Sequence, residues 1–203
     1  MSYYNAGKNK KRLFAVIGLI LVAAMLVSLF LVGCGSHHEE LERVMGLRAA
    51  LLGSGGCTFD AKITADYGEV SFAFSMACQA DGQGNMTFTV KEPESIAGIT
   101  GSVSAQGGKL TFDDTALAFD LLAEGQVTPV TAPWLLVKTL RGGYVTSCGM
   151  EEEKLRVSID DSYEEDALRL DIWLDDKDMP IYGEILWAER RILSMEIINF
   201  QIV

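Results

Sequence analysis

The sequence predicts an α+β domain built on a curled antiparallel sheet of about ten strands, an unclosed β-barrel, with two covering helices. From residue 57 onward, short segments of alternating apolar and polar residues follow one another, separated by turn residues, as in an antiparallel meander. Two further segments carry helix-start signals and apolar residues at helical spacing. A long antiparallel sheet curls as its twist accumulates, which creates a concave side for helices to cover.

The N-terminal segment predicts export. Four basic residues between positions 8 and 12 precede an apolar run from Leu13 to Gly33, which is the layout of a secretory signal. At the end of this run, Leu31-Val32-Gly33-Cys34 resembles the lipobox of bacterial lipoproteins. In that family the cysteine thiol receives a diacylglyceryl group, and a peptidase then cuts before the cysteine. The resemblance implies that Cys34 is the acylated N-terminus of the mature protein.

An uncleaved membrane anchor is the alternative. The run from Leu13 to Gly33 has 21 residues, enough to cross a hydrocarbon core of roughly 30 Å. The lipobox is more specific than length, so cleavage is the preferred interpretation. Both alternatives place the chain after Cys34 on the extracytoplasmic face of the cell membrane. The expected parts are a signal peptide at 1–33, a lipidated tether at 34–37 and one domain at 38–203.

The net charge narrows the class of partners. The formal net charge is −11, and the segment before Cys34 holds four basic residues and no acidic one, so the mature chain would carry about −15. A chain with this net negative charge lacks the cationic surface that phosphate contacts need, which argues against a nucleic-acid partner. It also argues against the protein body lying on anionic lipid, so the acyl chains must hold the protein at the membrane.

Helices and strands are expected at definite places. The first helix starts with the capping-box spacing of Ser36 and Glu39 and should end at the glycine-rich break that begins at Gly53. The second begins within 128–133, where prolines and cap residues suit a helix start, and runs for about ten residues. Strands are expected at 57–65, 69–79, 85–91, 97–104, 108–112, 115–120, 144–149, 153–159, 167–175, 180–188 and 191–202.

The first two strands predict a hairpin that turns at Tyr67 and Gly68. In the expected register Cys57 lies opposite Cys78, and the apolar pairs are Phe59–Met76, Ala61–Phe74, Ile63–Phe72 and Ala65–Val70. Such non-hydrogen-bonded pairs bring Cα atoms to about 4.5 Å, within reach of a disulfide. We therefore expect a Cys57–Cys78 disulfide, with two reduced core thiols as the alternative. Cys148 then remains as a small buried hydrophobic residue.

The sequence gives no support for an enzyme. Its only histidines, His37 and His38, lie just after the anchor, so a Ser-His or Cys-His nucleophile cannot be built within the domain. No Gly-x-Ser-x-Gly elbow, Walker loop or His-Glu-x-x-His motif occurs. The acidic runs lack calcium-loop spacing and fit solvated turns: Asp113-Asp114, Asp160-Asp161 and Asp175 to Asp178. We predict no catalytic residue, no metal site and no cofactor.

Aromatic and methionine side chains gather on one face of the first strands: Phe59, Ile63, Phe72, Phe74, Met76 and Phe88. One interpretation is an ordinary core. The other is that a curved sheet with only two short helices leaves part of this face open as a cavity. Flexible Met and Phe side chains would suit an acyl chain in such a cavity.

The order of these features resembles the LolA/LolB-like superfamily of lipoprotein carriers. The likeness covers most of residues 38–203 and consists of the lipobox, an early helix, a meander, the Thr-Pro-Val-Thr-Ala-Pro-Trp-Leu-Leu segment at 128–136 and closing strands around Met179-Pro180 and Ile192 to Phe200. The chain is also similar to small uncharacterised lipoproteins of Gram-positive anaerobes. The resemblance implies an unclosed β-barrel with helices over its mouth and a hydrophobic cavity that receives acyl chains, but it matches no functional residue.

Two functions follow as expectations. The first is a membrane-tethered, non-enzymatic lipoprotein that binds or handles lipid through the concave apolar face. The alternative is a structural or interaction lipoprotein, whose barrel is filled by its own side chains and whose acidic exterior meets an envelope protein or a cationic partner.

Overall fold

The computed structural model describes residues 36–68, 70–123, 126–164 and 167–203. The chain divides into two compact units, Met1–Glu39 and Glu40–Val203, and the architecture below is that of the second unit. Cys34 and the predicted signal peptide lie outside the described residues. Within the described ranges, no helix combines the length and the hydropathy that crossing a bilayer requires.

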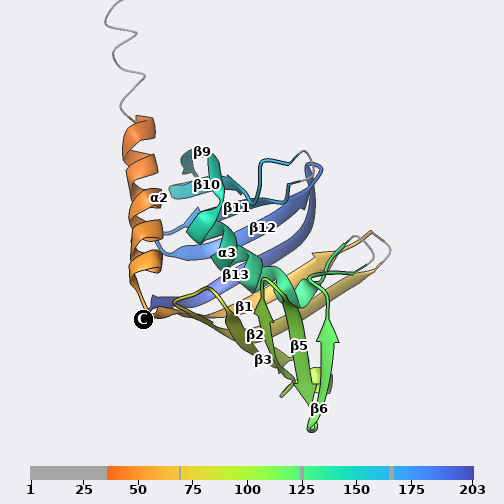
Figure 1. The fold of residues 1–203 in the computed structure, drawn as a ribbon. Coiled ribbons are helices and arrows are strands. Elements are labelled where there is room, and N and C mark those ends of the chain that lie inside the picture. Colours follow the sequence, from red (N-terminus) through yellow and green to blue (C-terminus); the bar gives the residue numbers. More distant parts are fainter. Residues whose placement is uncertain (1–35, 69, 124–125, 165–166) are drawn as a thin grey trace, which may run out of the picture. The chain divides into compact units, whose positions relative to one another are not determined.

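One antiparallel sheet of eleven strands forms the body of the second unit (Figure 1). Its strand order is β6-β5-β4-β3-β2-β1-β13-β12-β11-β10-β9, so neighbours are consecutive in sequence except where the first and last strands pair. The strands are β1 (Gly56–Asp66), β2 (Ser71–Asp81), β3 (Met86–Glu92), β4 (Thr100–Ser104), β5 (Gly107–Phe112), β6 (Thr115–Phe119), β9 (Tyr144–Glu151), β10 (Lys154–Asp160), β11 (Arg169–Leu174), β12 (Pro180–Trp187) and β13 (Arg190–Ile202).

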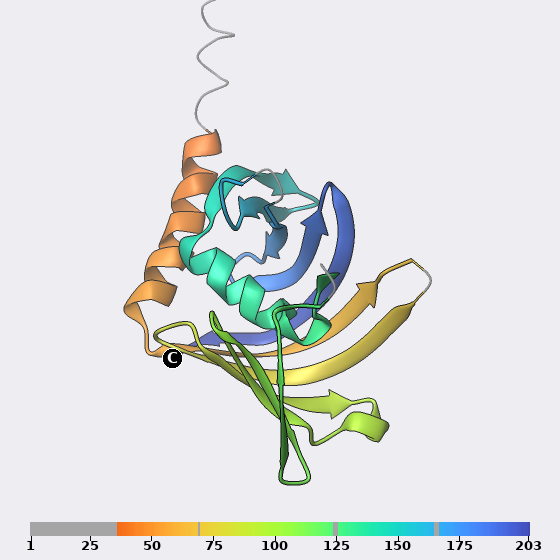
Figure 2. The ribbon, with the colours of Figure 1, turned by 45° about the vertical axis from the view of Figure 1, so that its right-hand side comes forward.

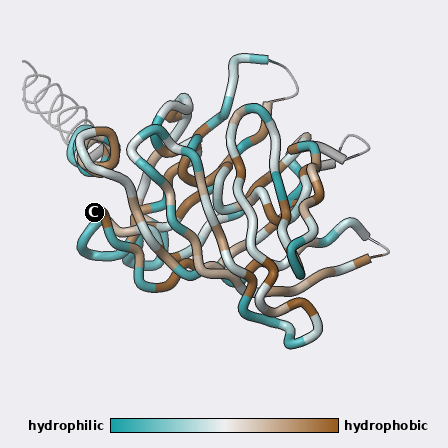
Figure 3. The backbone as a smooth tube through the Cα atoms, turned by 60° about the horizontal axis from the view of Figure 1, so that its bottom comes forward, coloured by the Kyte–Doolittle hydropathy of each residue, from teal (hydrophilic) through white to brown (hydrophobic). Residues whose placement is uncertain are grey.

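The sheet is open, with β6 and β9 as its edge strands, and it curls so that one face is concave (Figure 2). We call the concave face the inner face and the opposite one the outer face. Along β1, buried inner-face residues alternate with more exposed outer-face residues. Figure 3 shows the same pattern, with hydrophobic residues interspersed among hydrophilic ones along the strands. The inner face therefore carries the core.

Two helices accompany the sheet, α2 (Ser36–Gly53) and α3 (Ala132–Gly142). The sheet curves around α3, which contacts strands from both halves of the sheet, β2 and β10 (Figure 2). Eight of the eleven residues of α3 are buried, because the helix meets apolar side chains on most of its sides. The 3-10 turn η2 (Pro129–Thr131) leads into it. Within the described residues, the two α-helices lie where the sequence predicts them.

Two arginines tie α2 to α3. Arg48 of α2 donates to the carbonyls of Leu140 and Gly143 at 2.7 and 2.8 Å, and Arg141 of α3 donates to the carbonyl of Leu51 at 2.8 Å. Each guanidinium therefore satisfies carbonyls at the C-terminal end of the other helix, where the helix dipole also favours a cation. Burial lowers the pKa of Arg48.

Two inner-face glycines make room for aromatic rings. A Cβ at Gly108 would collide with the ring of Phe119 on the neighbouring strand, and a Cβ at Gly101 would collide with the ring of Phe88. The rings occupy the space that side chains would otherwise fill. Strands β4 and β5 can thus stay in the sheet beside large aromatic residues.

The first hairpin is confirmed, but its predicted register is wrong by two residues. The backbone N–H of Tyr67 donates to the carbonyl of Val70 at 3.0 Å, and Gly68 has a left-handed φ of 93°. The turn therefore lies one residue later than expected, because Gly68 fills the first of the two turn positions rather than the second. A shift of two keeps every side chain on its face, and the observed pairs are Ala61–Met76, Ile63–Phe74 and Ala65–Phe72.

The shifted register removes the geometric argument for a disulfide. Cys57 lies opposite Ala80, and Cys78 lies opposite Phe59. The two cysteines are diagonal neighbours on one face, and the Cα atoms of such neighbours are roughly 7–8 Å apart. Both are buried free thiols in this structure, as the alternative interpretation had it.

The remaining strands agree with the sequence pattern within a few residues, with two exceptions. The strand expected at 97–104 begins only at Thr100, after the 3-10 turn η1 (Glu94–Ile96). Pro93, which lacks an N–H to donate to the ladder, follows β3 and starts this interruption. Two short strands, β7 (Leu122–Ala123) and β8 (Gln126–Val127), form a separate pair. They are too short to show alternation in sequence.

Candidate apolar binding face

The six residues predicted to line a cavity form two groups. Phe59, Ile63, Met76 and Phe88 are at most 4% exposed and belong to the core. Phe74 is only partly buried against this core, and Phe72 is 50% exposed. The role of all six as lining residues stays a prediction, but only the second group presents surface to a ligand.

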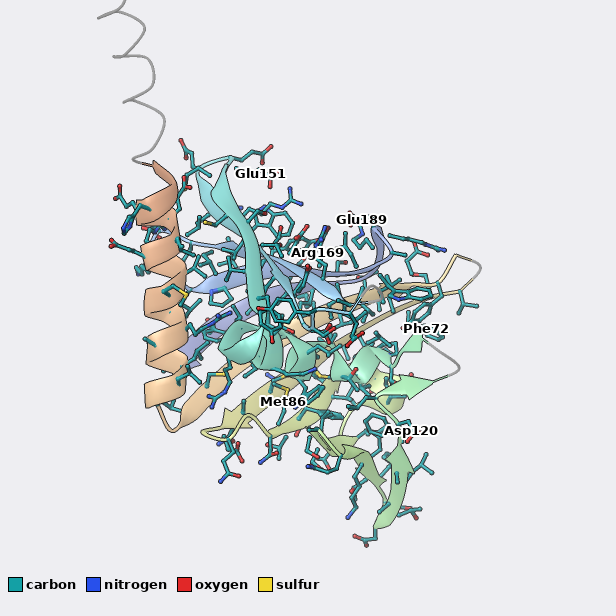
Figure 4. The ribbon with its side chains drawn as sticks, turned by 45° about the horizontal axis from the view of Figure 1, so that its top comes forward. Phe72, Met86, Asp120, Glu151, Arg169 and Glu189 are labelled. Atoms are coloured by element: carbon teal, nitrogen blue, oxygen red, sulfur yellow. The ribbon has the colours of Figure 1, made fainter. Side chains whose placement is uncertain are left out.

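Phe72 belongs to the inner face although it is exposed. It pairs with Ala65 of β1, which is fully buried on that face. Exposure along the inner face of β2 falls from 50% at Phe72 to 0% at Met76. Figure 4 shows Phe72 on the part of β2 that lies toward the hairpin tip. The inner face is thus covered over the middle of the sheet and uncovered toward this end.

A second uncovered stretch of the inner face lies on β5 and β6. Leu117 pairs with Leu110, which pairs with Gly101 of the inner face. Leu117 is 64% exposed and Phe112 is 57% exposed, while Leu110 and Phe119 are partly buried. We call the exposed and partly buried inner-face side chains the open apolar face: Phe72, Phe74, Leu110, Phe112, Leu117 and Phe119.

The open apolar face carries no charge on its two outer strands. Lys109 is the single charged residue of β5 and β6, and the pairing of the strands places it on the outer face. Exposed apolar side chains that share one face of a sheet differ from scattered surface leucines, which need no explanation. The six side chains of the open apolar face offer apolar surface and no group for acid–base chemistry.

The chain between β6 and α3 is fixed against the hairpin tip. The hydroxyl of Tyr67 donates to the carbonyl of Val127, and the hydroxyl of Thr128 donates to the carbonyl of Asp120 at 2.9 Å. Burial raises the pKa of Tyr67, so this hydroxyl stays a donor at neutral pH. The contact holds the segment after β6 beside the end of the β1–β2 hairpin that bears Phe72.

Two hollows with volumes above 700 Å³, both lined entirely by described residues, lie on the outer face. The first has a volume of about 720 Å³ and is formed by β1 to β5 with the end of β13. The second has a volume of about 760 Å³ and lies over β1, β2, β12 and β13 and the segment after β3. Neither coincides with the cavity that the sequence predicts on the inner face.

The cysteines are not poised for nucleophilic chemistry. Burial raises the pKa of Cys57 to about 11, and burial raises the pKa of Cys78 still further. Burial also raises the pKa of the partly buried Cys148. Because a thiolate is the form that attacks or binds a metal, the raised pKa values disfavour such chemistry at all three cysteines. Among the described residues, no group of three or more metal-ligating side chains comes together.

Comparisons with known proteins give structural likeness but no family. No protein-family model matches the chain, and no curated protein matches it in sequence. An uncharacterized conserved protein from Thermus thermophilus is 10% identical over 82% of this chain and 86% of its own, with a TM-score of 0.43.

Two further solved structures are similar at the same level. A LolA superfamily protein from Nitrosomonas europaea is 7% identical, with 84% and 94% of the two chains covered and a TM-score of 0.41. The lipoprotein LppX from Mycobacterium tuberculosis is 10% identical, with 79% and 91% covered and a TM-score of 0.38. Identities and scores this low do not assign the chain to a family.

Four residues of the open apolar face, all on β5 and β6, were not predicted from the sequence. Alternation of large apolar side chains is visible in the sequence on both strands. Leu110 and Phe112 alternate with polar residues before the Asp113-Asp114 turn, and Leu117 and Phe119 alternate with alanines after it. Alternation gives the face of a residue but not its exposure. Exposure depends on where α3 lies, which no local pattern reports.

Proposed function

We propose that the protein is a membrane-tethered, extracytoplasmic lipoprotein that binds acyl chains along the open apolar face and catalyses no reaction. The observation that carries the proposal is the exposure of Phe72, Phe112 and Leu117 on the same face of the sheet as the core. A ligand on this face would extend the apolar interior rather than occupy a separate pocket. This is also the use of a concave sheet that the LolA/LolB resemblance implies.

The energetics favour a chain of methylenes as ligand. Each buried methylene contributes about 0.8 kcal/mol, so burying roughly ten of them would contribute about 8 kcal/mol before ordering costs are subtracted. Phenylalanine and leucine side chains supply contact area without polar groups that would need partners. A polar ligand would find no hydrogen-bonding side chain among the six residues of this face.

The lipid anchor is part of the proposal. Cys34 lies two residues before α2, so acylation there would hold the domain close to the membrane that supplies the ligand. Stable anchoring needs two acyl chains, and the net charge of −11 for the whole chain argues against electrostatic adsorption to anionic lipid. Tethering would keep the binding face near lipid without fixing it to the surface.

Binding of a fluorescent fatty acid to residues 35–203 tests the proposal. Wild-type protein should bind saturably, and Leu117→Asp should weaken binding at least tenfold because it buries a carboxylate against the chain. Ile198→Asp is the matched control, since Ile198 is exposed and apolar but does not belong to the open apolar face. Folded wild-type protein that binds no fatty acid would contradict the proposal.

The interaction-protein alternative has one observation in its favour. Strand β6 is an edge strand, and three of its residues, Ala116, Leu117 and Ala118, are exposed and uncharged. Such an edge is open to pairing with a strand of another protein. If wild-type protein binds no fatty acid but an envelope protein protects the β6 amides from hydrogen exchange, the alternative is correct.

A further inference from the structure

We propose that the first hollow of the outer face, which we call the polar hollow, binds a segment of a neutral glycan. Its volume of about 720 Å³ is within the range of small-ligand sites. The outer-face residues of β1 to β5 line it together with Asn199 and Gln201 of β13. The sheet separates it from the open apolar face, and only the choice of a free polysaccharide over a lipid headgroup rests on the proposed function.

Nine of the sixteen residues that line the hollow carry an uncharged hydrogen-bonding group. Hydroxyls from five threonines and one serine share the hollow with the side-chain amides of Gln79, Asn199 and Gln201. Within the described part of the chain, two of these hydroxyls, those of Thr87 and Thr100, donate hydrogen bonds, each to a strand carbonyl at 3.5 Å. The three amides make no hydrogen bond to any described residue. Most of the donors and acceptors are therefore free for a ligand.

A β-bulge in β13 brings Asn199 into the hollow. Thr58 pairs with Gln201 and Asp60 with Ile198, so two residues of β13 lie opposite Phe59. Asn199 takes a left-handed φ of 56° at this point. The extra residue bends the strand and changes the direction of its side chains, a device common beside binding sites. Strand propensity accounts for the threonines, but it does not account for an asparagine in a bulge.

The hollow is also nearly free of charge. Its two charged residues are Asp60, which is paired with Lys91 at 2.7 Å, and Lys109. The outer face of the other half of the sheet differs, since polar residues there form ion pairs: Arg156–Asp171, Arg169–Asp160 and Arg191–Glu184 at 2.6 to 2.9 Å. The polar hollow thus differs in chemistry from the ion-paired outer face of β10 to β13 and from the second hollow, whose lining includes Lys62, Glu92 and Glu196.

The chemistry of the lining selects the ligand class by elimination. A chain with a net charge of −11 repels anions, and a cation would need carboxylates beyond the salt-bridged Asp60. An apolar ligand would leave seven of the nine hydroxyl and amide groups without water or a partner, since only Thr87 and Thr100 donate to strand carbonyls. A ligand rich in uncharged hydroxyls can both donate to and accept from these groups.

The hollow fits a free polysaccharide segment rather than a lipid headgroup. A headgroup is covalently linked to its acyl chains and stays close to them. The proposed acyl-chain face, however, lies on the opposite side of the sheet. One glycolipid cannot reach both sites through the sheet. The proposal therefore commits to a neutral polysaccharide of the envelope.

The experiment uses the full-length chain in lipid nanodiscs. An array of neutral oligosaccharides identifies the best binder, and calorimetry then compares wild type with Asn199→Gly and Gln79→Ala. Glycine keeps the left-handed backbone of the bulge and removes only the carboxamide. We expect each variant to lose at least about tenfold in affinity, since roughly 1.4 kcal/mol corresponds to tenfold. Gln83→Ala, which removes an exposed carboxamide outside the hollow, should bind as wild type does.

Several outcomes would overturn the inference. They are an array on which no neutral oligosaccharide is retained, a preference for charged over neutral glycans, and unchanged affinity in both hollow variants. Circular dichroism of each variant confirms that the fold is retained before affinities are compared. Leu117→Asp, the variant that tests fatty-acid binding, should keep full glycan affinity, so the two proposals fail independently.

Discussion

At the scale of single residues, the inner-face phenylalanines have two different roles. Phe88 is 3% exposed and lies against Gly101, a pairing that stabilises the sheet. Phe72 is on the same face but 50% exposed. The sequence pattern treats both as apolar positions of one face, and it cannot separate them because coverage by α3 is a long-range property.

Truncation to alanine distinguishes these roles. Phe88→Ala should lower the free energy of unfolding by about 3–5 kcal/mol, because it removes a buried ring and leaves a cavity. Phe72→Ala should lower it by less than about 1 kcal/mol, because the ring is half exposed. Urea unfolding of both variants measures the difference. Equal losses would show that Phe72 is a core residue and not part of an open face.

At the scale of elements, the helices are predictable from sequence but their mutual contacts are not. The capping box and the proline-rich start give α2 and α3 nearly the correct bounds. The bonds from Arg48 to the end of α3 join residues more than ninety positions apart. Local patterns carry no information about such partners. The register of the first hairpin was mispredicted for a local reason, because it depends on which turn position Gly68 occupies.

Replacement of Arg48 tests the contact between the helices. Arg48→Met should destabilise the protein by about 2–4 kcal/mol, because two part-buried carbonyls lose their donors. Arg48→Lys should cost less, since an ammonium can still reach one carbonyl. Lys154→Met, which removes an exposed cation from β10, serves as the control. A Met variant as stable as this control would show that the arginine does not hold the helices together.

At the scale of the whole molecule, the sheet consists of two meanders joined by the pair of β1 and β13. The pattern of turns predicts each meander, because consecutive strands with short turns pair with each other. It does not predict that the first and last strands meet, since this pairing joins segments about 130 residues apart and leaves no local signal. Because β1 pairs with β13 in the middle of the sheet, β6 and β9 become its unpaired edges. The same pairing sets the route of α3 across the concave face.

This topology explains why an apolar face stays open. A single helix of eleven residues lies within the curl of eleven strands, and among the described inner-face residues Phe72, Phe112 and Leu117 stay at least 50% exposed. The sequence predicts an uncovered apolar face but places it mainly on Phe59, Ile63, Met76 and Phe88, which are core. This uncovered stretch is the proposed binding site for acyl chains.

The most direct test is NMR of the soluble chain 35–203 with a spin-labelled fatty acid. The label broadens amide signals of nearby residues and so reports where the acyl chain lies. We expect saturable broadening of signals from the start of β2 and from β5 and β6, around Phe72, Phe112 and Leu117, with signals from β10 and β11 unchanged. Broadening confined to other strands, or no saturable broadening while the fold is intact, would contradict this expectation.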